Sequence, residues 1–296
     1  MRPLVRPGAA AAGVLIDALV GEPPLAPHPV SMFGWAMRGV ERHLYADTRR
    51  AGTAHAGAGI ALGAGAGAVI GSTALATYVA VAGRALRVAA QDVHDALERG
   101  ELDRARSLLP SLVGRDATGL DAKEIARAAV ESVAENTVDA VVAPALWGAV
   151  LGAPGALAYR AVNTMDAMVG HRSARYERYG FSAARLDDGA NWIPARVTAA
   201  LVAVVRPRRA ASIWSTVRRH AAAHPSPNAG VAESAFAAAL DLRLGGTNRY
   251  GDRIELRPHL GDGRPAEPAD IRRATRLARD TSVALAAGLL FIEAVG

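Results

Sequence analysis

A stretch of 33 residues without a charged side chain, residues 51–83, lies between Arg50 and Arg84 and constrains this chain more than any other feature. About 20 apolar residues cross the hydrocarbon core of a bilayer, so the stretch is long enough for a membrane span. It is rich in glycine, which is a poor helix former in water but allows membrane helices to pack closely. We therefore predict a membrane-embedded helix. A soluble, alanine-rich helical bundle is the alternative, since the mean hydropathy of +0.13 is modest.

Other uncharged runs extend this prediction to a polytopic, all-α integral membrane protein with one domain, residues 1–296. We expect spans near 4–20, 53–83 and 281–296, and further apolar segments at 140–159 and 193–205 that span, re-enter or are buried in protein. The run 140–159 contains helix-breaking Pro and Gly residues, which a membrane tolerates where protein satisfies the backbone. The large polar regions are then 84–139, 160–192 and 206–280, and the positive-inside tendency places them together on the cytoplasmic side.

The remaining pattern is helical, with one irregular region. Asp121 is positioned to cap a helix that runs to about Asp139, and a charged helix over 270–279 leads into the last apolar segment. Residues 245–268 form a loop rich in Gly and Pro, with a short hairpin at 249–257. No internal repeat and no alternation of strands with helices is visible.

Composition excludes several functional classes. The chain has no Cys, so disulfide scaffolds, thiolate zinc sites and thiol nucleophiles are excluded. The net charge is +6, but only 5% of residues are aromatic and no basic run has the form of a nucleic-acid-binding motif, so we expect no nucleic-acid partner. Residues 206–280 hold 14 basic and 8 acidic residues, and this excess equals the whole net charge.

Three acids repeat at helical spacing in the sequence Glu131-Ser-Val-Ala-Glu135-Asn136-Thr-Val-Asp139. In a continuous α-helix they lie one above another, where like charges repel. The repulsion suggests a bound cation, general-base chemistry or a positively charged amine as ligand. A solvated acidic face is the structural alternative.

Two later segments also concentrate polar side chains beside apolar runs. Asn163 and Asp166 share one helical face, and residues 185–196 contain two acids, an amide and two arginines: Arg185, Asp187, Asp188, Asn191 and Arg196. Adjacent carboxylates with a nearby amide are hard oxygen ligands suited to Mg²⁺, and Arg suits phosphate or carboxylate. An interfacial turn anchored by Trp192 is the structural alternative. His171 lies beside Arg172 and is more typical of a surface group than of an acid–base catalyst.

Two shorter motifs complete the set. Ser226 or Asn228 is placed to cap a helix at Gly230, where free N–H groups make either an anion site or an ordinary cap. Near the N-terminus, Asp17 and His28 flank a rigid Pro-rich turn. No phosphate loop, no Rossmann glycine pattern and no zinc-protease or serine-hydrolase motif is present.

In this order, the blocks resemble the CobD/CbiB family of cobalamin biosynthesis proteins over nearly the whole chain. The resemblance is carried by Asp17…Gly21-Glu22-Pro23-Pro24…His28-Pro29, Gly114-Arg115-Asp116, Glu131-Ser132-x-Ala134-Glu135-Asn136-x2-Asp139-x4-Pro144, Tyr159-Arg160-x2-Asn163-Thr164-x-Asp166-x2-Val169-Gly170, Arg175-Tyr176, Ala184-Arg185-Leu186-Asp187-Asp188…Asn191-Trp192-Ile193-Pro194-Ala195-Arg196 and His224-Pro225-Ser226-Pro227-Asn228-Ala229-Gly230. Glu22 stands where the family more often has Asp, and His171-Arg172 where it often has Tyr-Lys.

The resemblance implies an adenosylcobinamide-phosphate synthase located in the inner membrane as a multi-pass protein. Such an enzyme joins a carboxylate of the corrinoid adenosylcobyric acid to (R)-1-aminopropan-2-ol or its O-phosphate. The product is adenosylcobinamide or its phosphate. The family's reaction is described as ATP-dependent, which implies ATP and Mg²⁺ as cofactors. Its implied partners are the corrinoid, aminopropanol phosphate, the lipid bilayer and other membrane enzymes of late cobalamin synthesis.

In that reaction we expect Glu131, Glu135, Asp187 and Asp188 to hold Mg²⁺, one of them also taking the proton from the attacking ammonium, with Asp139 completing the catalytic set. We expect the substrates to be bound by these residues: Arg115, Arg185 and Arg196 at phosphate or corrinoid carboxylates; Asn136, Asn163 and Asn191 at corrinoid amides; Ser226, Asn228 and Gly230 at a phosphate; and Asp17, His28 and Asp166 elsewhere in the site.

Two rival classes remain open from the sequence. A transporter would line its path with the same acids and Asn residues, although about half the chain is polar and no inverted repeat is visible. A membrane scaffold for corrinoid intermediates would leave the three spaced acids unexplained.

Overall fold

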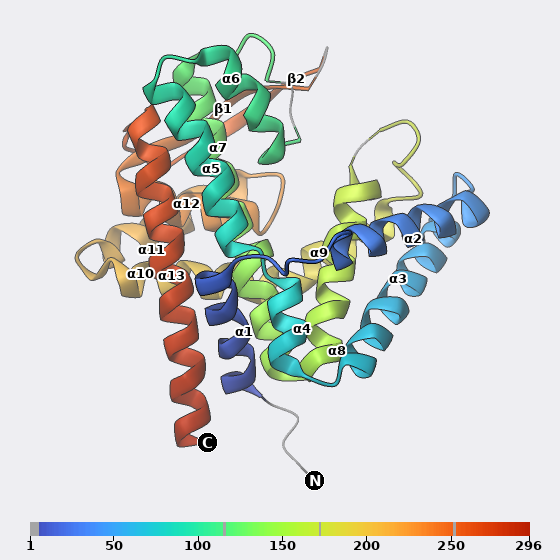
Figure 1. The fold of residues 1–296 in the computed structure, drawn as a ribbon. Coiled ribbons are helices and arrows are strands. Elements are labelled where there is room, and N and C mark those ends of the chain that lie inside the picture. The colour runs from blue at the N-terminus through green and yellow to red at the C-terminus, as the bar shows by residue number, and fades with distance from the viewer. Residues whose placement is uncertain (1–5, 115–116, 172, 251–252) are drawn as a thin grey trace. The chain divides into compact units, whose positions relative to one another are not determined.

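The computed structural model describes residues 6–114, 117–171, 173–250 and 253–296, and this part of the chain is mostly helical (Figure 1). The chain, expected to be a single domain, forms two compact units that each combine distant parts of the sequence. Unit 1 comprises Met1–Ala82, Asp139–Trp192 and Leu285–Gly296, and unit 2 comprises Gly83–Val138 and Ile193–Ala284.

Every secondary-structure element in the described part of unit 1 is a helix or a helical turn. Its elements are α1 (Pro7–Val20), α2 (Pro29–Leu44), α3 (Arg49–Ile70), α4 (Thr73–Ala80), the π-helical turn η2 (Val138–Val142), α8 (Ala143–Met165), a second π-helical turn η3 (Asp166–Gly170) and α9 (Phe181–Ala190). The uncharged run at 53–83, expected as one segment, is divided: Gly71 adopts a left-handed conformation and ends α3, and Ser72 caps α4.

The Gly residues of α3 allow it to pack directly on the backbone of α8. A Cβ atom at Gly63 would lie 2.6 Å from the carbonyl oxygen of Leu157, and Gly67 faces Ala153 in the same way. The space beside Gly59, four residues before Gly63, is filled by the side chain of Met165. The three glycines follow one face at a spacing of four residues, so the expectation that small residues serve close helix packing is confirmed.

Helix α8 bends where the sequence predicts a break. Gly152 has a φ of 69° inside the helix, and Pro154 follows it. Pro144, by contrast, lies in the first turn of α8, directly after the π-helical turn η2. The site residues described below lie on the part of α8 that follows this break.

Unit 2 surrounds one buried helix. Its elements are α5 (Gly83–Glu98), α6 (Leu102–Leu108), the 3₁₀ turn η1 (Leu109–Ser111), α7 (Ala122–Thr137), α10 (Trp192–Val205, entering from unit 1), the 3₁₀ turns η4 (Pro207–Arg209) and η5 (Ala221–Ala223), α11 (Ala210–His220), α12 (Ala229–Leu240), strands β1 to β3 and α13 (Pro268–Val295, whose end belongs to unit 1). All residues of α12 are buried, which makes it the core of the unit.

Two local predictions in unit 2 are confirmed. Asp121 caps α7 and forms a capping box with Glu124. The expected hairpin exists but is longer than predicted, because β1 (Leu242–Tyr250) pairs antiparallel with β2 (Arg253–Leu260). The short β3 (Arg264–Pro265) pairs in parallel with β1, so a small three-stranded sheet of order β2-β1-β3 is added to the predicted all-α fold.

Within the described residues, two helical segments are long and apolar enough to cross a membrane: Arg49–Ile70 and Ala122–Gly170. The apolar window of the second is 67% buried inside the protein, as in the core helix of a soluble protein, whereas that of the first is only 28% buried. Helix α1 covers the expected span near 4–20 and is 14 residues long. The expected span at 281–296 is the second half of α13.

Candidate functional site

Asp187 is the centre of a hydrogen-bond network in unit 1 that joins α8 to α9. The side-chain amide of Asn163, on α8, donates to Oδ1 of Asp187 over 3.3 Å, and the amide of Asn191 donates to Oδ2 over 3.0 Å. Three residues singled out from the sequence therefore lie together, although 24 positions separate Asn163 from Asp187. Two neutral donors hold the carboxylate in a fixed orientation.

Each of the two amides is itself oriented by a donor from α8. The hydroxyl of Tyr159 donates to Oδ1 of Asn191 over 2.8 Å, and the guanidinium of Arg160 donates to Oδ1 of Asn163 over 3.4 Å. With their oxygens engaged, both amides turn their nitrogens toward Asp187. Tyr159 and Arg160 were not among the predicted site residues, but they lie four and three positions before Asn163. That spacing on one helical face could have identified them.

Burial and a neighbouring acid raise the pKa of Asp187 above its ordinary value. Burial is the largest cause, the amides of Asn163 and Asn191 oppose it, and the charge of Asp188 adds to it. Burial also raises the pKa of Asp188, opposed by Arg185 at 3.6 Å. A carboxylate with a raised pKa is a better proton acceptor, which suits general-base chemistry.

Charged groups from two other segments of unit 1 act on Arg160. Asp139, in η2, and Glu22, in the loop after α1, both interact electrostatically with its guanidinium. The backbone oxygen of Asp139 accepts a bond from Tyr159 over 3.4 Å. Glu22, of the Gly21-Glu22 motif, and Asp139 therefore belong to the surroundings of the Asp187 network.

The other predicted residues of unit 1 make local contacts. Asp17 is buried on α1, and its backbone oxygen accepts a bond from Gly21 where the helix ends. His28 caps α2, its Nδ1 accepting from the N–H of Val30 over 3.3 Å. The carboxylate of Asp166 packs against Gly170, where any side chain would collide with it. His171 is exposed and packs edge-on against Tyr176, with ring centroids 5.0 Å apart.

Glu131 lies in unit 2 and ties α7 to the sheet. Its carboxylate accepts the N–H of Gly245 over 2.8 Å and pairs with Arg127 at 3.2 Å. Arg127 also donates to the backbone oxygens of Gly245 and Thr247, both at 2.7 Å. Arg127 precedes Glu131 by four residues, so the helix does place a cation beside this acid. This i, i+4 pair can be seen in the sequence once the basic residues of the helix are considered together with its acids.

The three acids at helical spacing do not all lie in regular α-helix. Helix α7 ends at Thr137, and Asp139 lies in the π-helical turn that follows. Glu131 is buried but Glu135, one turn later, is exposed. Asn136 donates to the backbone and hydroxyl oxygens of Ser132 at 3.0 and 3.1 Å, which fastens the end of α7.

At the start of α12, Ser226 performs the capping that the sequence assigned to Ser226 or Asn228. Its hydroxyl accepts from the N–H groups of Asn228 and Ala229 at 3.3 and 3.1 Å. The side chain of Asn228 instead accepts from Arg196 over 3.2 Å, so the 185–196 block meets this turn within unit 2 through Arg196. Gly230 is required because a side chain there would collide with Ala221.

A second buried polar cluster adjoins this turn and was not predicted as a site. Nε2 of His224 lies 2.9 Å from the guanidinium of Arg257 and 3.6 Å from Glu233. Burial is the main cause that lowers the pKa of His224, and the charge of Arg257 adds to it. A neutral His224 accepts the hydrogen bond from Arg257, so the side chains of this cluster bind one another and fix the loop before α12.

The predicted magnesium ligands fall on both units: Glu131 and Glu135 in unit 2, and Asp187 and Asp188 in unit 1. Among the residues that the structure describes, no three His, Asp or Glu side chains gather as a metal site. Asp187 and Asp188 remain as an adjacent pair. Arg115, predicted to bind phosphate or carboxylate, lies outside the described residues.

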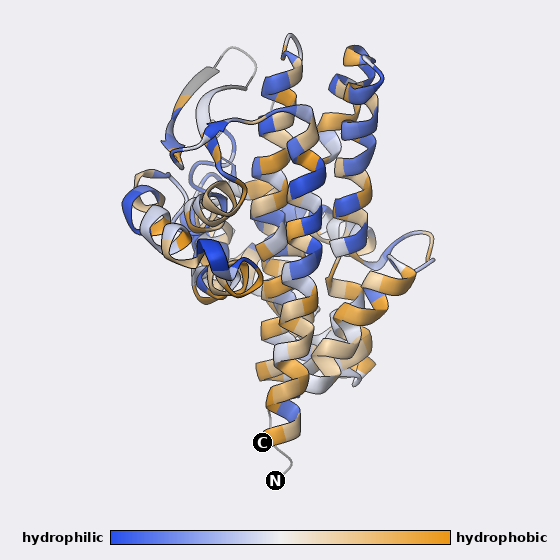
Figure 2. Cartoon of the chain, turned by 90° about the vertical axis from the view of Figure 1, so that its left-hand side faces the viewer, coloured by the Kyte–Doolittle hydropathy of each residue, from blue (hydrophilic) through white to orange (hydrophobic). Residues whose placement is uncertain are grey.

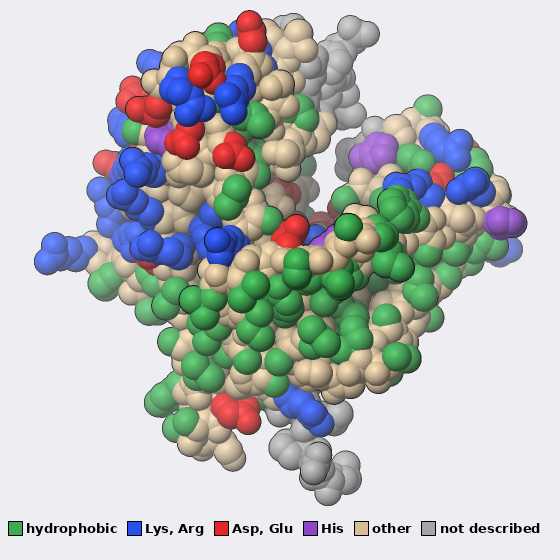
Figure 3. Space-filling model, in the orientation of Figure 1, with side chains coloured by type: hydrophobic (Ala, Val, Ile, Leu, Met, Phe, Trp, Pro, Cys, Tyr) green, Lys and Arg blue, Asp and Glu red, His purple; other side chains and the backbone are tan. Residues whose placement is uncertain are grey.

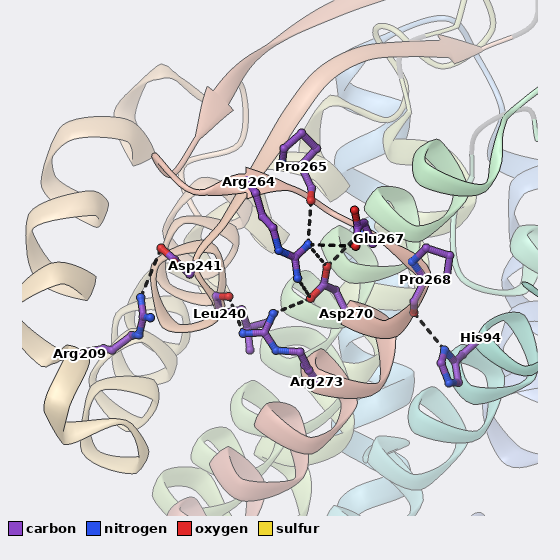
Figure 4. Close-up of polar contacts among 10 residues, drawn as sticks. All are labelled: His94, Arg209, Leu240, Asp241, Arg264, Pro265, Glu267, Pro268, Asp270 and Arg273. Atoms are coloured by element: carbon purple, nitrogen blue, oxygen red, sulfur yellow. Dashed lines mark hydrogen bonds and ion pairs between the residues drawn. The ribbon is translucent and has the colours of Figure 1, made fainter. Parts of the chain in front are cut away.

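The densest set of ion pairs in Figure 4 surrounds Asp270, which the sequence analysis did not single out. Its fully buried carboxylate accepts two bonds from Arg264, at 2.7 and 2.9 Å, and one from Arg273 at 2.6 Å. Arg273 also donates to the backbone oxygen of Leu240. The cluster therefore fastens β3 and the end of α12 to the start of α13, a structural role within unit 2.

Comparison with known proteins matches this chain to one family model. The model described as "CobD/Cbib protein" covers residues 10–278. The chain belongs to the CobD/CbiB family. Among its relatives, the cobalamin biosynthesis protein CobD of Mycobacterium tuberculosis is 48% identical, over 90% of this chain and 89% of the relative. CobD proteins of Geobacter metallireducens and Rhodobacter capsulatus are 42% and 44% identical, over 87% and 72% of this chain and 86% and 67% of the relatives. No solved structure matches this CobD/CbiB-family chain.

Proposed function

We propose that this CobD/CbiB-family protein acts in late cobalamin biosynthesis as an amide-forming synthase. It joins a carboxylate of adenosylcobyric acid to (R)-1-aminopropan-2-ol or its O-phosphate, giving adenosylcobinamide or its phosphate. Two observations support the proposal: the relatives named as cobalamin biosynthesis proteins, and the oriented, partly buried carboxylate of Asp187, which carries the argument for an enzyme.

The chemistry requires an activated carboxylate and a base. A free carboxylate acylates poorly at neutral pH because it has no good leaving group, so it must first become an acyl phosphate or a similar species. ATP, when bound, supplies the phosphoryl group. The amine then attacks the carbonyl carbon, the new C–N bond forms, and phosphate leaves with the electrons of the broken C–O bond. The ammonium nitrogen loses two protons in all: the departing phosphate takes up one, and a base must remove the other before the nitrogen can attack.

Asp187 is the residue that we assign to this proton. Its raised pKa makes it a stronger base than an exposed Asp, and Asn163 and Asn191 fix the direction of its lone pairs. Asp188 lies next to it with Arg185 at 3.6 Å, which suits a phosphate or a corrinoid carboxylate near the same base. Arg160 adds a second guanidinium beside Asn163.

The carboxylates of this site fit Mg²⁺ only if the ion is bound together with the phosphates of a nucleotide. Such ions keep several waters and take one or two protein carboxylates together with phosphate oxygens. Asp188 is a carboxylate of that kind, whereas the described residues hold no cluster of three. Asp188 would hold the ion, which would supply positive charge to phosphate oxygens, and Asp187 stays free of the cation so that it can accept the proton.

We also propose that the protein acts in the inner membrane. The two apolar helical segments support this location, and α3 supports it more strongly because its apolar side chains are largely not covered by protein. Val69, near its end, is 89% exposed. A large apolar group that is left uncovered in this way is stabilised by lipid.

The reaction can be tested directly with the purified full chain in detergent or vesicles. Incubation with adenosylcobyric acid, aminopropanol phosphate, ATP and Mg²⁺ should give the amide product by mass spectrometry, and Asp187→Asn should abolish it. Asp47→Asn is the matched control, since Asp47 is an exposed acid of the same unit that pairs with Arg178 at 3.8 Å. Corrinoid uptake into vesicles without product would instead indicate a transporter, and neither activity would indicate a scaffold.

A further inference from the structure

The exposed face of α13 changes from basic to apolar along the helix axis. Residues 272, 276, 279, 283, 287 and 290 follow one another at spacings of three or four, so they share one stripe of the helix. All six are exposed, and the first three are Arg272, Arg276 and Arg279. The next three are apolar: Val283, Ala287 and Leu290. Figure 2 shows this change, with hydrophilic colours in the first half of α13 and hydrophobic colours toward the C-terminus.

The opposite face of α13 explains why the stripe is uncovered. Ile271, Ala274, Leu277 and Leu285 are buried, so the helix already packs on the protein through that side. On the stripe, Val283 and Leu290 are 54% and 46% exposed, and Phe291 beside them is 68% exposed. A row of uncovered apolar side chains this regular indicates a surface that meets an apolar medium.

Two of the three arginines have no acidic partner among the residues that the structure describes. Arg264, Arg273 and Arg279 each have an acidic partner, but among the described residues neither Arg272 nor Arg276 has one. Figure 3 shows that basic side chains gather on the part of unit 2 that carries α11 and α13. An unpaired guanidinium on an exposed face is a site for an anion.

A second helix of unit 2 shows the same change at the same level. Arg206, at the end of α10, pairs with Asp280 of α13 at 2.9 Å, which places the two chain segments side by side. Val204, just before it, is 68% exposed, and the turn that follows contains the exposed Arg208 and Arg209. Two helices thus pass from arginine to apolar residues where Arg206 meets Asp280.

We propose that this boundary marks where unit 2 meets a bilayer, and that Arg272 and Arg276 bind the headgroups of anionic phospholipids. An ordered change from cation to apolar along a helix matches the gradient from headgroup to acyl chain. A protein partner would instead require an apolar centre with a polar rim around it. The inference rests on the membrane location proposed above and is independent of the reaction.

The length of the apolar segment limits the proposal to one membrane face. From Arg279 to Glu293 the helix rises about 21 Å, which is less than the hydrocarbon thickness of about 30 Å. Glu293 accepts the N–H of Gly8 over 3.0 Å, at the start of α1. The stripe therefore enters the acyl region below the headgroups that Arg272 and Arg276 bind.

Depth can be measured because the chain contains no Cys, so single cysteines can be labelled without background. Full-length Arg276→Cys, Val283→Cys and Leu290→Cys, carrying a bimane label in phosphatidylcholine–phosphatidylglycerol vesicles, are compared with Leu62→Cys on α3. We expect aqueous iodide to quench the label at 276 and acyl-chain nitroxides to quench it at 283, 290 and 62. Iodide access at 283 and 290 together with lipid quenching at 62 would overturn this inference but leave the proposed membrane location intact. Iodide access at 62 as well would overturn the membrane location too.

Headgroup binding has its own test. Energy transfer from a label at Val283→Cys to headgroup-labelled phosphatidylglycerol reports how far this lipid is enriched beside α13. Arg272→Gln with Arg276→Gln should lower the local affinity by roughly five-fold per arginine. Arg99→Gln with Arg104→Gln removes the same charge from an exposed site of unit 2 where both arginines pair with Glu101, and should leave the enrichment unchanged. Equal enrichment in the two double variants would contradict lipid binding.

Discussion

The hydroxyl of Tyr159 donates to the side-chain oxygen of Asn191 over 2.8 Å, and this bond decides which end of the Asn191 amide faces Asp187. Both residues are almost fully buried, at 3% and 1% exposure. The nitrogen of the amide is left to donate to Asp187 at 3.0 Å. A residue that contacts no carboxylate oxygen thereby controls the orientation of the proposed base, which makes Tyr159 a positioning residue.

Tyr159→Phe should lower turnover while leaving the fold in place. The phenylalanine keeps the ring but removes the donor, so the Asn191 amide is free to turn its oxygen toward Asp187. Loss of one such hydrogen bond costs about 1 kcal/mol, which corresponds to roughly five- to tenfold in rate. Steady-state kinetics should show the loss in kcat, with KM for the corrinoid nearly unchanged.

The control for this variant is Tyr176→Phe. The hydroxyl of Tyr176 also donates a hydrogen bond within unit 1, but its acceptor is the carboxylate of Glu41, at 2.9 Å, and not a member of the Asp187 network. A comparable loss of thermal stability without loss of kcat is expected. Equal kcat in the two variants would remove Tyr159 from the positioning role.

The pH dependence of turnover should report the raised pKa of Asp187. A base acts when it is ionised, so the rate should fall as the pH drops through the pKa of Asp187 in the folded protein. That fall should occur above the ordinary range of an Asp, because burial and the charge of Asp188 raise the pKa. Asp188→Asn removes the second cause and should move the fall to lower pH. A pH–rate profile that is identical in Asp188→Asn and the unaltered protein would contradict this coupling.

The sequence predicts the members of the Asp187 network better than their arrangement. Asn163, Asp187 and Asn191 were singled out as polar residues beside apolar runs, and the structure brings them together. Tyr159 and Arg160 belong to a motif that carries the family resemblance, but no role was predicted for them from the sequence. Only the fold shows that their donors meet the amide oxygens, since that depends on how α9 packs on α8.

For the acids at the end of α7, the sequence predicted the helix but not the surroundings of the acids. Helical periodicity correctly predicted the helix and its Asp121 cap, but it assumed that the helix continues unchanged to Asp139. The π-helical turn at 138–142 interrupts the α-helical repeat before Asp139. The pairing of Glu131 with Gly245 could not be predicted either, because it depends on a contact across 114 residues.

Glu131→Gln separates a structural role from metal binding. The glutamine oxygen still accepts the N–H of Gly245, but the ion pair with Arg127 is lost, so we expect destabilisation of about 1–2 kcal/mol. Turnover should persist when the assay is run below the melting temperature. If Glu131 holds Mg²⁺, the variant should instead need much more of the metal for half-maximal rate. A magnesium titration of both proteins, begun after EDTA treatment, distinguishes the two roles.

Asp270 should control the acid stability of unit 2. Burial alone would raise its pKa, but the bonds from Arg264, from the N–H of Glu267 and from Arg273 outweigh it and hold the pKa below the ordinary value. A lowered pKa means that the unfolded chain binds the proton more readily. The stabilisation is therefore complete above the ordinary pKa of an Asp and is lost as the pH falls through the lower pKa of the folded state.

Asp270→Asn should remove most of this stabilisation at neutral pH. Arg264 and Arg273 are 47% and 42% exposed, so solvent partly compensates them, and we expect a loss of about 2 kcal/mol. For a chain of this size the melting temperature should fall by roughly 5 °C, and the fall should shrink in acid. Asp262→Asn is the control, because Asp262 pairs with Arg219 on an exposed surface and its loss should be much smaller. Equal melting temperatures for Asp270→Asn and Asp262→Asn at neutral pH would show that the buried cluster does not stabilise the unit.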